Sequence, residues 1–281
     1  MMQNGQRPLV LVRGAGDLAT GIIVRLHRCG FRVAATECAD PSAIRRKAAL
    51  CEAVWHGTAT VEGVTARKVA AADAEAVLRA GEIPLVVDED ACCAASLRPA
   101  AVVDAILAKR NLGTHRGMAP ITVGVGPGFA AGEDVDAVVE TMRGHHLGRV
   151  IRQGSVIPNT GVPGVIAGYA AERVIHAPAD GAMVFVADAH GETVDIGALV
   201  RAGQEIARVG DVPVLATIDG VLRGLIREGY PVHAGLKIAD IDPRPEQAAF
   251  CDTVSDKARA IGGGVVEALL ALADERGIAL L

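Results

Sequence analysis

The sequence VRGAGDLATG, residues Val12–Gly21, stands where an apolar run over Leu9–Val12 meets a segment with apolar residues at helical spacing over Leu18–His27. Strand, glycine turn and helix in this order are typical of a dinucleotide-binding unit, whose last small residue can be alanine. The first glycine permits the tight turn, the second lets the backbone approach a phosphate, and the third position lets helix and strand pack closely. In this chain those positions are Gly14, Gly16 and Ala19.

The residues after the turn extend the same unit. A second strand is expected over Phe31–Thr36, and Glu37 follows it at about the offset where an acidic residue binds a ribose hydroxyl. The helix N-terminus offers unpaired N–H groups and a positive dipole end to an anion. The sequence therefore predicts a nucleotide or phosphate site, with a purely structural glycine turn as the alternative. The predicted ligand contacts of this unit are Gly14, Gly16, Asp17, Ala19, Thr20, Gly21 and Glu37.

Asp17 is unusual in such a turn. A carboxylate beside a phosphate is repelled unless a cation lies between them. Asp17 therefore either caps the helix or holds Mg²⁺ together with the phosphate.

Composition bounds the class of protein. The chain has 281 residues, which suits one large or two medium domains, and 51% of them are hydrophobic but only 2% aromatic. The net charge is −5 and the basic residues are scattered, so we expect no nucleic-acid partner. No stretch approaches the roughly 20 apolar residues of a membrane span, and the N-terminus lacks the pattern of a signal peptide. These features favour a cytoplasmic protein.

Cysteines and histidines give weak signals for chemistry. None of the six cysteines forms a CxxC pair, so no structural zinc site is expected. The adjacent Cys92 and Cys93 have two interpretations, as acceptors of sulfur, selenium or a soft metal, or as small residues near a helix start. The adjacent His145 and His146 lack an evident third ligand, and a surface turn is favoured there. The sequence predicts no metal site and identifies no catalytic residue.

A second glycine turn lies in Ile121–Phe129, ITVGVGPGF, after another apolar strand. Two glycine loops at strand ends could contact two parts of one ligand, since ligands bind beyond the carboxyl ends of parallel strands. The alternative is that these glycines only accommodate positive φ. The predicted contacts here are Gly124, Gly126 and Gly128, together with Asn111, and the weaker candidates are Asp88, Lys109, Arg143 and His145.

From Gly148 onward the composition becomes that of an all-β segment, with glycine and proline every few residues. It contains an imperfect repeat, Ala-x-x-Asp-Gly followed by Val-x-x-Gly, with copies over residues 176–206 and 216–238. Paired half-motifs of this kind resemble the biotinyl/lipoyl barrel fold. A swinging-arm carrier needs a lysine in the hairpin between the halves, and the expected hairpin Val209–Leu215 has none. A scaffold or docking module is therefore expected.

The predicted fold class is α/β plus β. A Rossmann-like parallel-sheet domain covers residues 1–147, because short apolar strands alternate with helical segments, among them a helix over 41–53. A barrel-sandwich-like β domain covers 148–245, and a helical segment covers 246–281. In the last segment, Gly262–Gly264 is expected to separate two helices.

Six segments together carry a resemblance that extends over nearly the whole chain. They are Val12–Gly21, Val103–Asn111, Val123–Phe129, Ile157–Gly161, Asp219–Leu225 and Lys237–Arg244. With them the chain resembles the YqeB family of accessory proteins associated with selenium-dependent molybdenum hydroxylases. The resemblance implies a maturation factor that acts on the molybdenum cofactor, its nucleotide form, or the hydroxylase that receives it. This implied role is similar to that of XdhC-type chaperones, which hold the cofactor before insertion and also use a Rossmann-like domain.

Three functional hypotheses follow. The leading one is a maturation protein that binds a nucleotide or molybdopterin dinucleotide, with Mg²⁺ as an option, and has a molybdenum hydroxylase apoenzyme as its partner. The alternatives are an NAD(P)-dependent oxidoreductase, for which no proton donor can be named, and a non-enzymatic docking module. Whether the protein is an enzyme or a homo-oligomer stays open.

Overall fold

The computed structural model describes residues 7–161 and 164–281, which form two compact units. Unit 1 consists of residues 7–41, 49–159 and 254–281, and unit 2 of residues 42–48, 160–161 and 164–253. These limits differ from the domain boundaries expected at 147/148 and 245/246. The difference arises because the C-terminal helix packs on the sheet of unit 1, whereas residues 42–48 pair with strands of unit 2.

Unit 1 is built on one nine-stranded sheet. Its strands are β1 (Leu9–Arg13), β2 (Arg32–Glu37), β3 (Thr58–Val61), β4 (Val64–Lys68), β5 (Ile83–Val87), β6 (Ala101–Asp104), β7 (Ile121–Val125), β8 (Ala137–Val139) and β9 (Val150–Ile151). Their order in space is β3-β4-β5-β2-β1-β6-β7-β8-β9. In this spatial order, each pair of neighbouring strands between β4 and β8 is parallel. The edge pairs β3–β4 and β8–β9 are antiparallel. The expected mostly parallel α/β sheet is confirmed.

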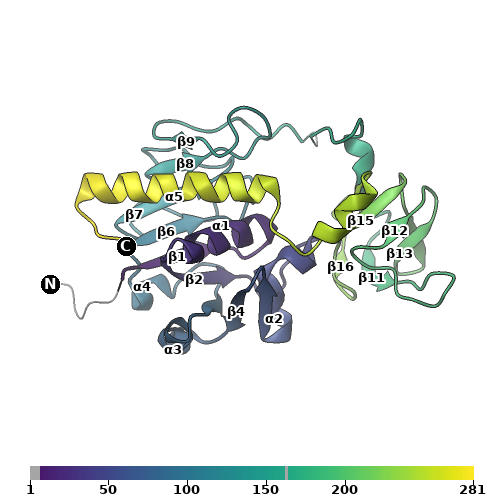
Figure 1. Cartoon of the computed structure of the whole chain (residues 1–281), viewed down its shortest axis with the longest axis horizontal. Helices are drawn as coiled ribbons and strands as arrows, with labels where there is room; N and C mark the ends of the chain where they lie inside the picture. Colours follow the sequence, from purple (N-terminus) through teal and green to yellow (C-terminus); the bar gives the residue numbers. More distant parts are fainter. Residues whose placement is uncertain (1–6, 162–163) are drawn as a thin grey trace. The chain divides into compact units, whose positions relative to one another are not determined.

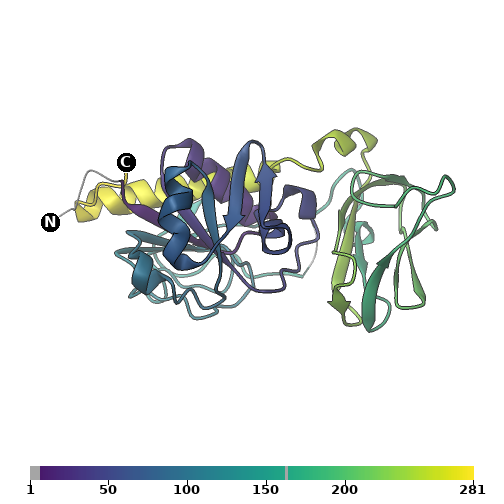
Figure 2. The same ribbon diagram turned by 90° about the horizontal axis from the view of Figure 1, so that it is seen from below.

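Helices cover this sheet. They are α1 (Asp17–Arg28), α2 (Ala53–His56), α3 (Ala74–Arg79), α4 (Ala94–Leu97) and α5 (Asp256–Arg276), with 3₁₀ turns η2 (Leu50–Glu52) and η3 (Ala71–Asp73). The yellow α5 and the purple α1 lie side by side (Figure 1, Figure 2). Leu9 and Leu11 share one face of β1, where Leu78 of α3 and Leu97 of α4 pack near them. Near the two ends of the chain, α1 and α5 thus pack against each other.

The predicted helix over residues 41–53 is wrong. Up to Glu52 the segment contains only the 3₁₀ turns η1 (Arg46–Ala48) and η2, separated by Ala49 in an extended conformation, and α2 begins at Ala53. Its backbone N–H groups bond to distant parts of the chain, since Leu50 N donates to Thr20 Oγ1 and Cys51 N to the Ala15 carbonyl. These tertiary hydrogen bonds replace those of a helix.

The expected break at Gly262–Gly264 is also wrong, because α5 runs through it without interruption. Ser255 caps its first turn by accepting the N–H of Ala258, and Gly277 ends it in a left-handed conformation. The glycines permit close approach. A Cβ on Gly262 would lie 3.1 Å from the Gly21 carbonyl oxygen, and one on Gly264 would lie 2.1 Å from that of Gly148.

We expect Gly264→Ala to lower the free energy of unfolding by about 1–3 kcal/mol, because the added methyl overlaps backbone that cannot move aside. The matched control is Gly263→Ala, whose Cβ would meet nothing within 4 Å. There the better helix propensity of alanine should stabilise the protein by up to about 1 kcal/mol. Urea unfolding followed by circular dichroism measures both. Equal effects of the two substitutions would contradict the packing role of Gly264.

Unit 2 consists of two four-stranded antiparallel sheets, β10-β17-β15-β12 and β14-β13-β11-β16. The strands are β10 (Val174–His176), β11 (Gly181–Phe185), β12 (Leu199–Val200), β13 (Glu205–Val209), β14 (Val212–Leu215), β15 (Gly220–Leu225), β16 (Pro231–Val232) and β17 (Lys237–Asp242). The 3₁₀ turns η4 (Ala171–Arg173) and η5 (Pro245–Phe250) flank them. Residues 42–48 join this unit, as Leu225 N donates to the Ile44 carbonyl and Arg46 Nε to that of Leu225.

The two copies of the sequence repeat have matching structures. Asp180 in the first copy accepts the N–H of Ala234 at 2.7 Å, and Asp219 in the second accepts that of Ala202 at 2.8 Å. Gly181 and Gly220, which follow the two aspartates, both have φ of +154°. Each copy therefore uses its Asp-Gly pair to bind the backbone of the other copy.

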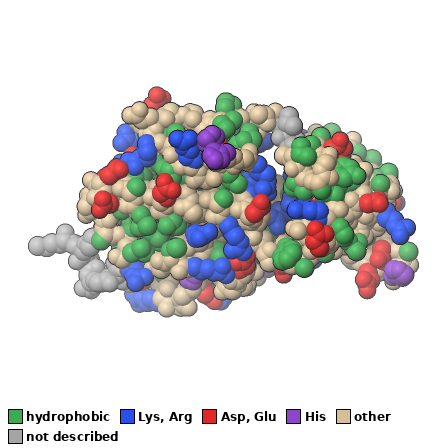
Figure 3. Space-filling view, turned by 45° about the horizontal axis from the view of Figure 1, so that its top comes forward, with side chains coloured by type: hydrophobic (Ala, Val, Ile, Leu, Met, Phe, Trp, Pro, Cys, Tyr) green, Lys and Arg blue, Asp and Glu red, His purple; other side chains and the backbone are tan. Residues whose placement is uncertain are grey.

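The surface of unit 1 mixes charges of both signs in the view of Figure 3, where blue basic side chains alternate with red acidic and green apolar ones. In the described part of the chain, no helix combines the length and the apolar character that crossing a membrane requires.

Candidate functional site

The candidate site lies at the carboxyl edge of the parallel sheet, between β1 and β6. The chain continues from β1 to β2 on one side, whereas β6 leads to β7 on the other. Ligands of open α/β sheets bind beyond the strand ends where the order reverses in this way. The loops after β1 and β6 meet here, since a Cβ on Gly14 would lie 3.0 Å from the Ala105 carbonyl oxygen. Gly14 also has a φ of +94°, so both turn geometry and close packing require glycine there.

Gly16 has neither of these structural reasons. Its φ of −64° and ψ of 179° are open to any residue, and an added Cβ would meet nothing within 4 Å. Gly16 is the N-cap residue of α1, and no side chain caps the first turn of that helix. The glycine thus leaves free space in front of a helix N-terminus, where N–H groups and the dipole favour an anion.

Glu37, at the end of β2, holds the glycine turn in place. Its Oε2 accepts the N–H of Ala15 at 2.8 Å, and its Oε1 accepts that of Cys38 at 2.9 Å. The Cys38 thiol also bonds to this carboxylate, which still leaves acceptor capacity for another donor. The predicted acidic residue therefore lies directly beside the turn.

The remaining predicted contacts of the first turn divide into two groups. Asp17 is partly exposed beside Gly16. Thr20 is fully buried, donates to the Ala15 carbonyl and accepts the N–H of Leu50. Ala19 is buried as well, and Gly21 faces α5, where its Cβ would lie 2.5 Å from that of Ala258. Ala19, Thr20 and Gly21 thus stabilise the fold around the turn, and only Asp17 borders its open space.

Two cysteines next to Glu37 experience a negative field. Burial, followed by the charges of Glu37, Glu52 and Asp17, raises the pKa of the buried Cys51 thiol well above its usual value. Burial and then Glu37 raise the pKa of Cys38 to about 12. Both thiols are therefore protonated at neutral pH and are poor nucleophiles. The negative charges of Glu37, Glu52 and Asp17 also disfavour the binding of a phosphate without a cation. A phosphate that binds here is therefore expected to bring a cation with it.

Arg13, which is not among the site residues predicted from the sequence, is the main polar group at this edge. It ends β1, is 1% exposed, and donates to Thr114 Oγ1 at 2.5 Å and to the Glu89 carbonyl at 2.8 Å. Its Nη1 lies 3.5 Å from Oδ2 of the buried Asp104, which also accepts the Thr114 hydroxyl at 2.6 Å. Among the described residues, Arg13 Nε has no hydrogen-bond partner. The sequence feature that could have identified Arg13 is its position at the end of a wholly apolar strand.

The Arg13–Asp104–Thr114 network connects the loops that follow β1, β5 and β6. Burial raises the pKa of Asp104, although Thr114, the Ile106 N–H and Arg13 act in the opposite direction. This buried pair fixes the walls of the site rather than contacting solvent.

Asn111 positions Thr114. Its side chain accepts the Thr114 N–H and donates to the Thr114 carbonyl, both at 2.8 Å. The same loop contains Leu107 and Lys109 with φ of 61°, a conformation that is strained for residues with side chains. Asn111 thus acts on the site through Thr114, and its predicted contact with a ligand stays a prediction.

The second glycine turn packs against the loop after β6. A Cβ on Gly124 would lie 2.6 Å from the Phe129 ring, and one on Gly128 would lie 2.7 Å from the backbone of Arg110. Gly126 has a φ of +81°, and a Cβ there would lie 3.0 Å from Thr141 Oγ1 and 3.2 Å from Leu107. Packing accounts for all three glycines, and their predicted contact with a ligand stays a prediction.

The residues predicted as weaker ligand contacts each contact a different neighbour in the protein. Asp88 accepts the N–H of the buried Cys93, whose pKa burial and Asp88 raise to about 12. Arg143 pairs with Asp256 at 2.8 Å, and the rings of His145 and His146 meet edge to face. Within residues 7–161 and 164–281, no group of three or more His, Cys, Asp or Glu side chains is arranged to hold a metal ion.

Comparison with known proteins gives one informative relative. No family model matches the chain. The product-bound structure of the ectoine utilization protein EutE (DoeB) from Ruegeria pomeroyi is 13% identical over 85% of this chain and 86% of that chain, with a TM-score of 0.24. The uncharacterized protein YqeB of Escherichia coli (strain K12) is 50% identical over 265 residues. The match covers 94% of this chain and 48% of YqeB, so the chain spans about half the length of that relative. The chain is a homologue of E. coli YqeB.

Proposed function

We propose that unit 1 binds a nucleotide or the dinucleotide form of the molybdenum cofactor at the carboxyl edge of its sheet. The open space in front of Gly16, at the uncapped N-terminus of α1, carries this proposal. The strand order supports it, because β5-β2-β1-β6-β7-β8 is the order 3-2-1-4-5-6 of Rossmann-type folds.

The proposal assigns roles to the N-terminus of α1, to Glu37 and to Asp17. The first-turn N–H groups of α1 donate to a phosphate that enters the space left by Gly16. Glu37 holds the turn through Ala15 and offers its remaining lone pairs to a ribose hydroxyl. Asp17 binds Mg²⁺ that accompanies the phosphate, which offsets the local negative charge.

The biological role that we propose is that of an accessory protein for the maturation of a selenium-dependent molybdenum hydroxylase. It rests on the family resemblance and on the homology to YqeB, whose name assigns no activity. We propose unit 2 as the part that docks the hydroxylase apoenzyme. Its paired sheets and reciprocal Asp-Gly contacts resemble a biotinyl/lipoyl barrel. The hairpin between β13 and β14 has Gly210 and Asp211 at its tip, which leaves no lysine for a swinging arm.

Native mass spectrometry of the protein purified from a host that makes molybdenum cofactor tests the ligand. A bound species with the mass of a pterin dinucleotide supports the proposal. Adducts of NAD(P) mass alone would overturn the cofactor assignment and favour an oxidoreductase. Absence of any nucleotide adduct, together with no binding in titrations with nucleotides and Mg²⁺, would overturn the site itself.

We expect Gly16→Val to weaken binding of that ligand at least about 100-fold, because the valine side chain fills the space in front of α1. The fold should be retained, since the backbone of Gly16 suits valine and its Cβ meets nothing within 4 Å. Isothermal titration calorimetry with and without Mg²⁺ measures the loss and tests the cation bridge to Asp17. The control is Gly263→Ala, where a side chain also enters open space but on α5. Unchanged affinity in Gly16→Val would show that the turn is structural.

A further inference from the structure

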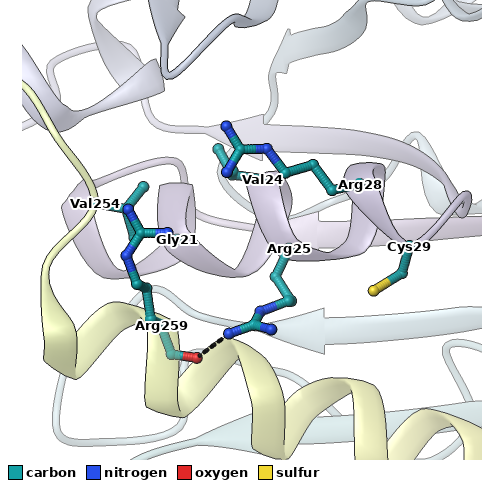
Figure 4. A pocket seen from close by; sticks show the side chains of 7 residues that line it. All are labelled: Gly21, Val24, Arg25, Arg28, Cys29, Val254 and Arg259. Carbon is teal, nitrogen blue, oxygen red and sulfur yellow. Dashed lines mark hydrogen bonds between the residues drawn. The ribbon is translucent and has the colours of Figure 1, made fainter.

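A second cavity in unit 1 lies between α1 and the start of α5, and it shares no residue with the open space at Gly16. Its volume is about 210 Å³. Figure 4 shows the side chains of α1 and of the start of α5 that line it, with Arg25 bonded to the Arg259 carbonyl. The lining residues are Gly21, Val24, Arg25, Arg28, Cys29, Val254 and Arg259.

Arginine dominates this cavity. Glu62, in the turn between β3 and β4, bonds to both Arg28 and Arg259. Although desolvation acts in the opposite direction, hydrogen bonds from the Val254 N–H and Arg28 lower the pKa of Glu62, so it is ionised at neutral pH. Two of the three arginines thus share one carboxylate, and the three arginines with Glu62 carry an excess of two positive charges.

Arg25 provides the uncommitted donors. Its one described side-chain hydrogen bond goes to the Arg259 carbonyl at 3.3 Å, and among the described residues it has no carboxylate partner. A guanidinium has five N–H donors in a planar fork that matches phosphate oxygens. Most donors of Arg25 therefore remain available to a ligand.

Two backbone segments border the cavity. Arg259 lies in the first turn of α5, where the positive end of the helix dipole adds to the positive potential. Glu62 has a φ of 49°, an uncommon conformation for glutamate, while its carbonyl also accepts from Arg28. The hairpin is thus tied to the rim of the cavity by both backbone and side chain.

We propose that this cavity binds a phosphate group. The excess of two positive charges matches the charge of about −2 on a phosphate monoester or inorganic phosphate near neutral pH. The cavity is smaller than the roughly 300 Å³ at the lower end of typical ligand pockets, which suits a phosphate group rather than a whole nucleotide. The phosphate is either inorganic or the terminal group of a small phosphorylated compound.

Isothermal titration calorimetry with inorganic phosphate and with O-phosphoserine, at constant ionic strength in chloride, tests the proposal. We expect Arg25→Gln to weaken binding at least about tenfold, because a charge-assisted hydrogen bond is lost. Arg25→Lys should retain part of the affinity. Arg79→Gln on the exposed surface of α3 should bind like the unmodified protein. Gly16→Val closes the phosphate position proposed at the start of α1, so the binding that this variant retains reports this cavity alone.

Labelling of Cys29 locates the bound ion. The exposed Cys29 thiol lines the cavity, whereas the exposed Cys92 does not. Bound phosphate should slow alkylation of Cys29 by iodoacetamide relative to Cys92, as measured by peptide mass spectrometry.

In the titrations, tighter binding of inorganic phosphate identifies a free ion, and tighter binding of O-phosphoserine identifies a phosphorylated compound. No heat of binding for either, full affinity in Arg25→Gln, or unchanged Cys29 labelling would overturn the proposal.

Discussion

Arg13→Met should lower the free energy of unfolding by about 3–5 kcal/mol, the cost of removing one partner of a buried ion pair. Arg13 and Asp104 are 1% and 2% exposed, and their charged groups lie 3.5 Å apart. Methionine fills much of the space but leaves the Asp104 carboxylate without a counter-charge. It also removes the donors to Thr114 Oγ1 and the Glu89 carbonyl. Urea unfolding at neutral pH measures the loss.

A double-mutant cycle separates the ion pair from simple loss of packing. In Arg13→Met combined with Asp104→Asn no uncompensated charge remains, so the double variant should recover about half or more of the loss. The control is Arg79→Met, which removes an exposed pair with Glu75 and should change stability by less than about 0.5 kcal/mol. A loss below about 1 kcal/mol in Arg13→Met would show that the network does not hold the strand ends together.

Asp136→Asn should destabilise the protein by about 2–4 kcal/mol, because Asp136 connects the end of α5 to the sheet. The buried carboxylate accepts the Thr122 N–H at 2.8 Å and the Thr122 hydroxyl at 3.0 Å. It also pairs with Arg116 and Arg276, each at 2.8 Å. Asparagine has one acceptor oxygen and no charge, so several of these contacts are lost together. Urea unfolding at pH 7 measures the change.

The same residue predicts a specific pH dependence. Although desolvation opposes ionisation, Arg276, Thr122 and Arg116 lower the pKa of Asp136 from 3.8 to about 2. The folded state thus holds this proton less tightly than the unfolded chain. Asp136 therefore contributes about 2 kcal/mol that is fully present above pH 4 and is lost as the pH falls toward 2. Urea midpoints between pH 2 and 5 should show a shallower slope in Asp136→Asn, whereas Glu133→Gln, an exposed neighbour, should keep the slope of the unmodified protein.

The first βαβ unit could be predicted because its information is local. The strand over Leu9–Arg13, the turn at Gly14 and the helix from Asp17 are contiguous in the chain. Glu37 lies beside the turn because β2 pairs in parallel with β1, as the pattern required. The internal repeat could also be recognised from the sequence, because each Asp-Gly pair needs a glycine at the same strained backbone position.

Other elements could not be predicted because distant partners decide them. The segment over residues 41–53 has helical spacing, yet Leu50 bonds to Thr20 and Ile44 to Leu225. The triple glycine resembles a break but permits α5 to approach α1 and the Gly148 loop. Local propensity is weak compared with such tertiary contacts.

The sequence by itself determined the parallel sheet, the glycine turn and the position of Glu37, because hydrophobic period and turn residues act over a few neighbours. Only the tertiary structure decided which glycine leaves open space and which glycines serve packing. It alone brought Arg13 to Asp104 and Thr114, and Arg25 and Arg28 to Arg259. These groups are far apart in the chain, and burial and charge pairing between them depend on the completed fold.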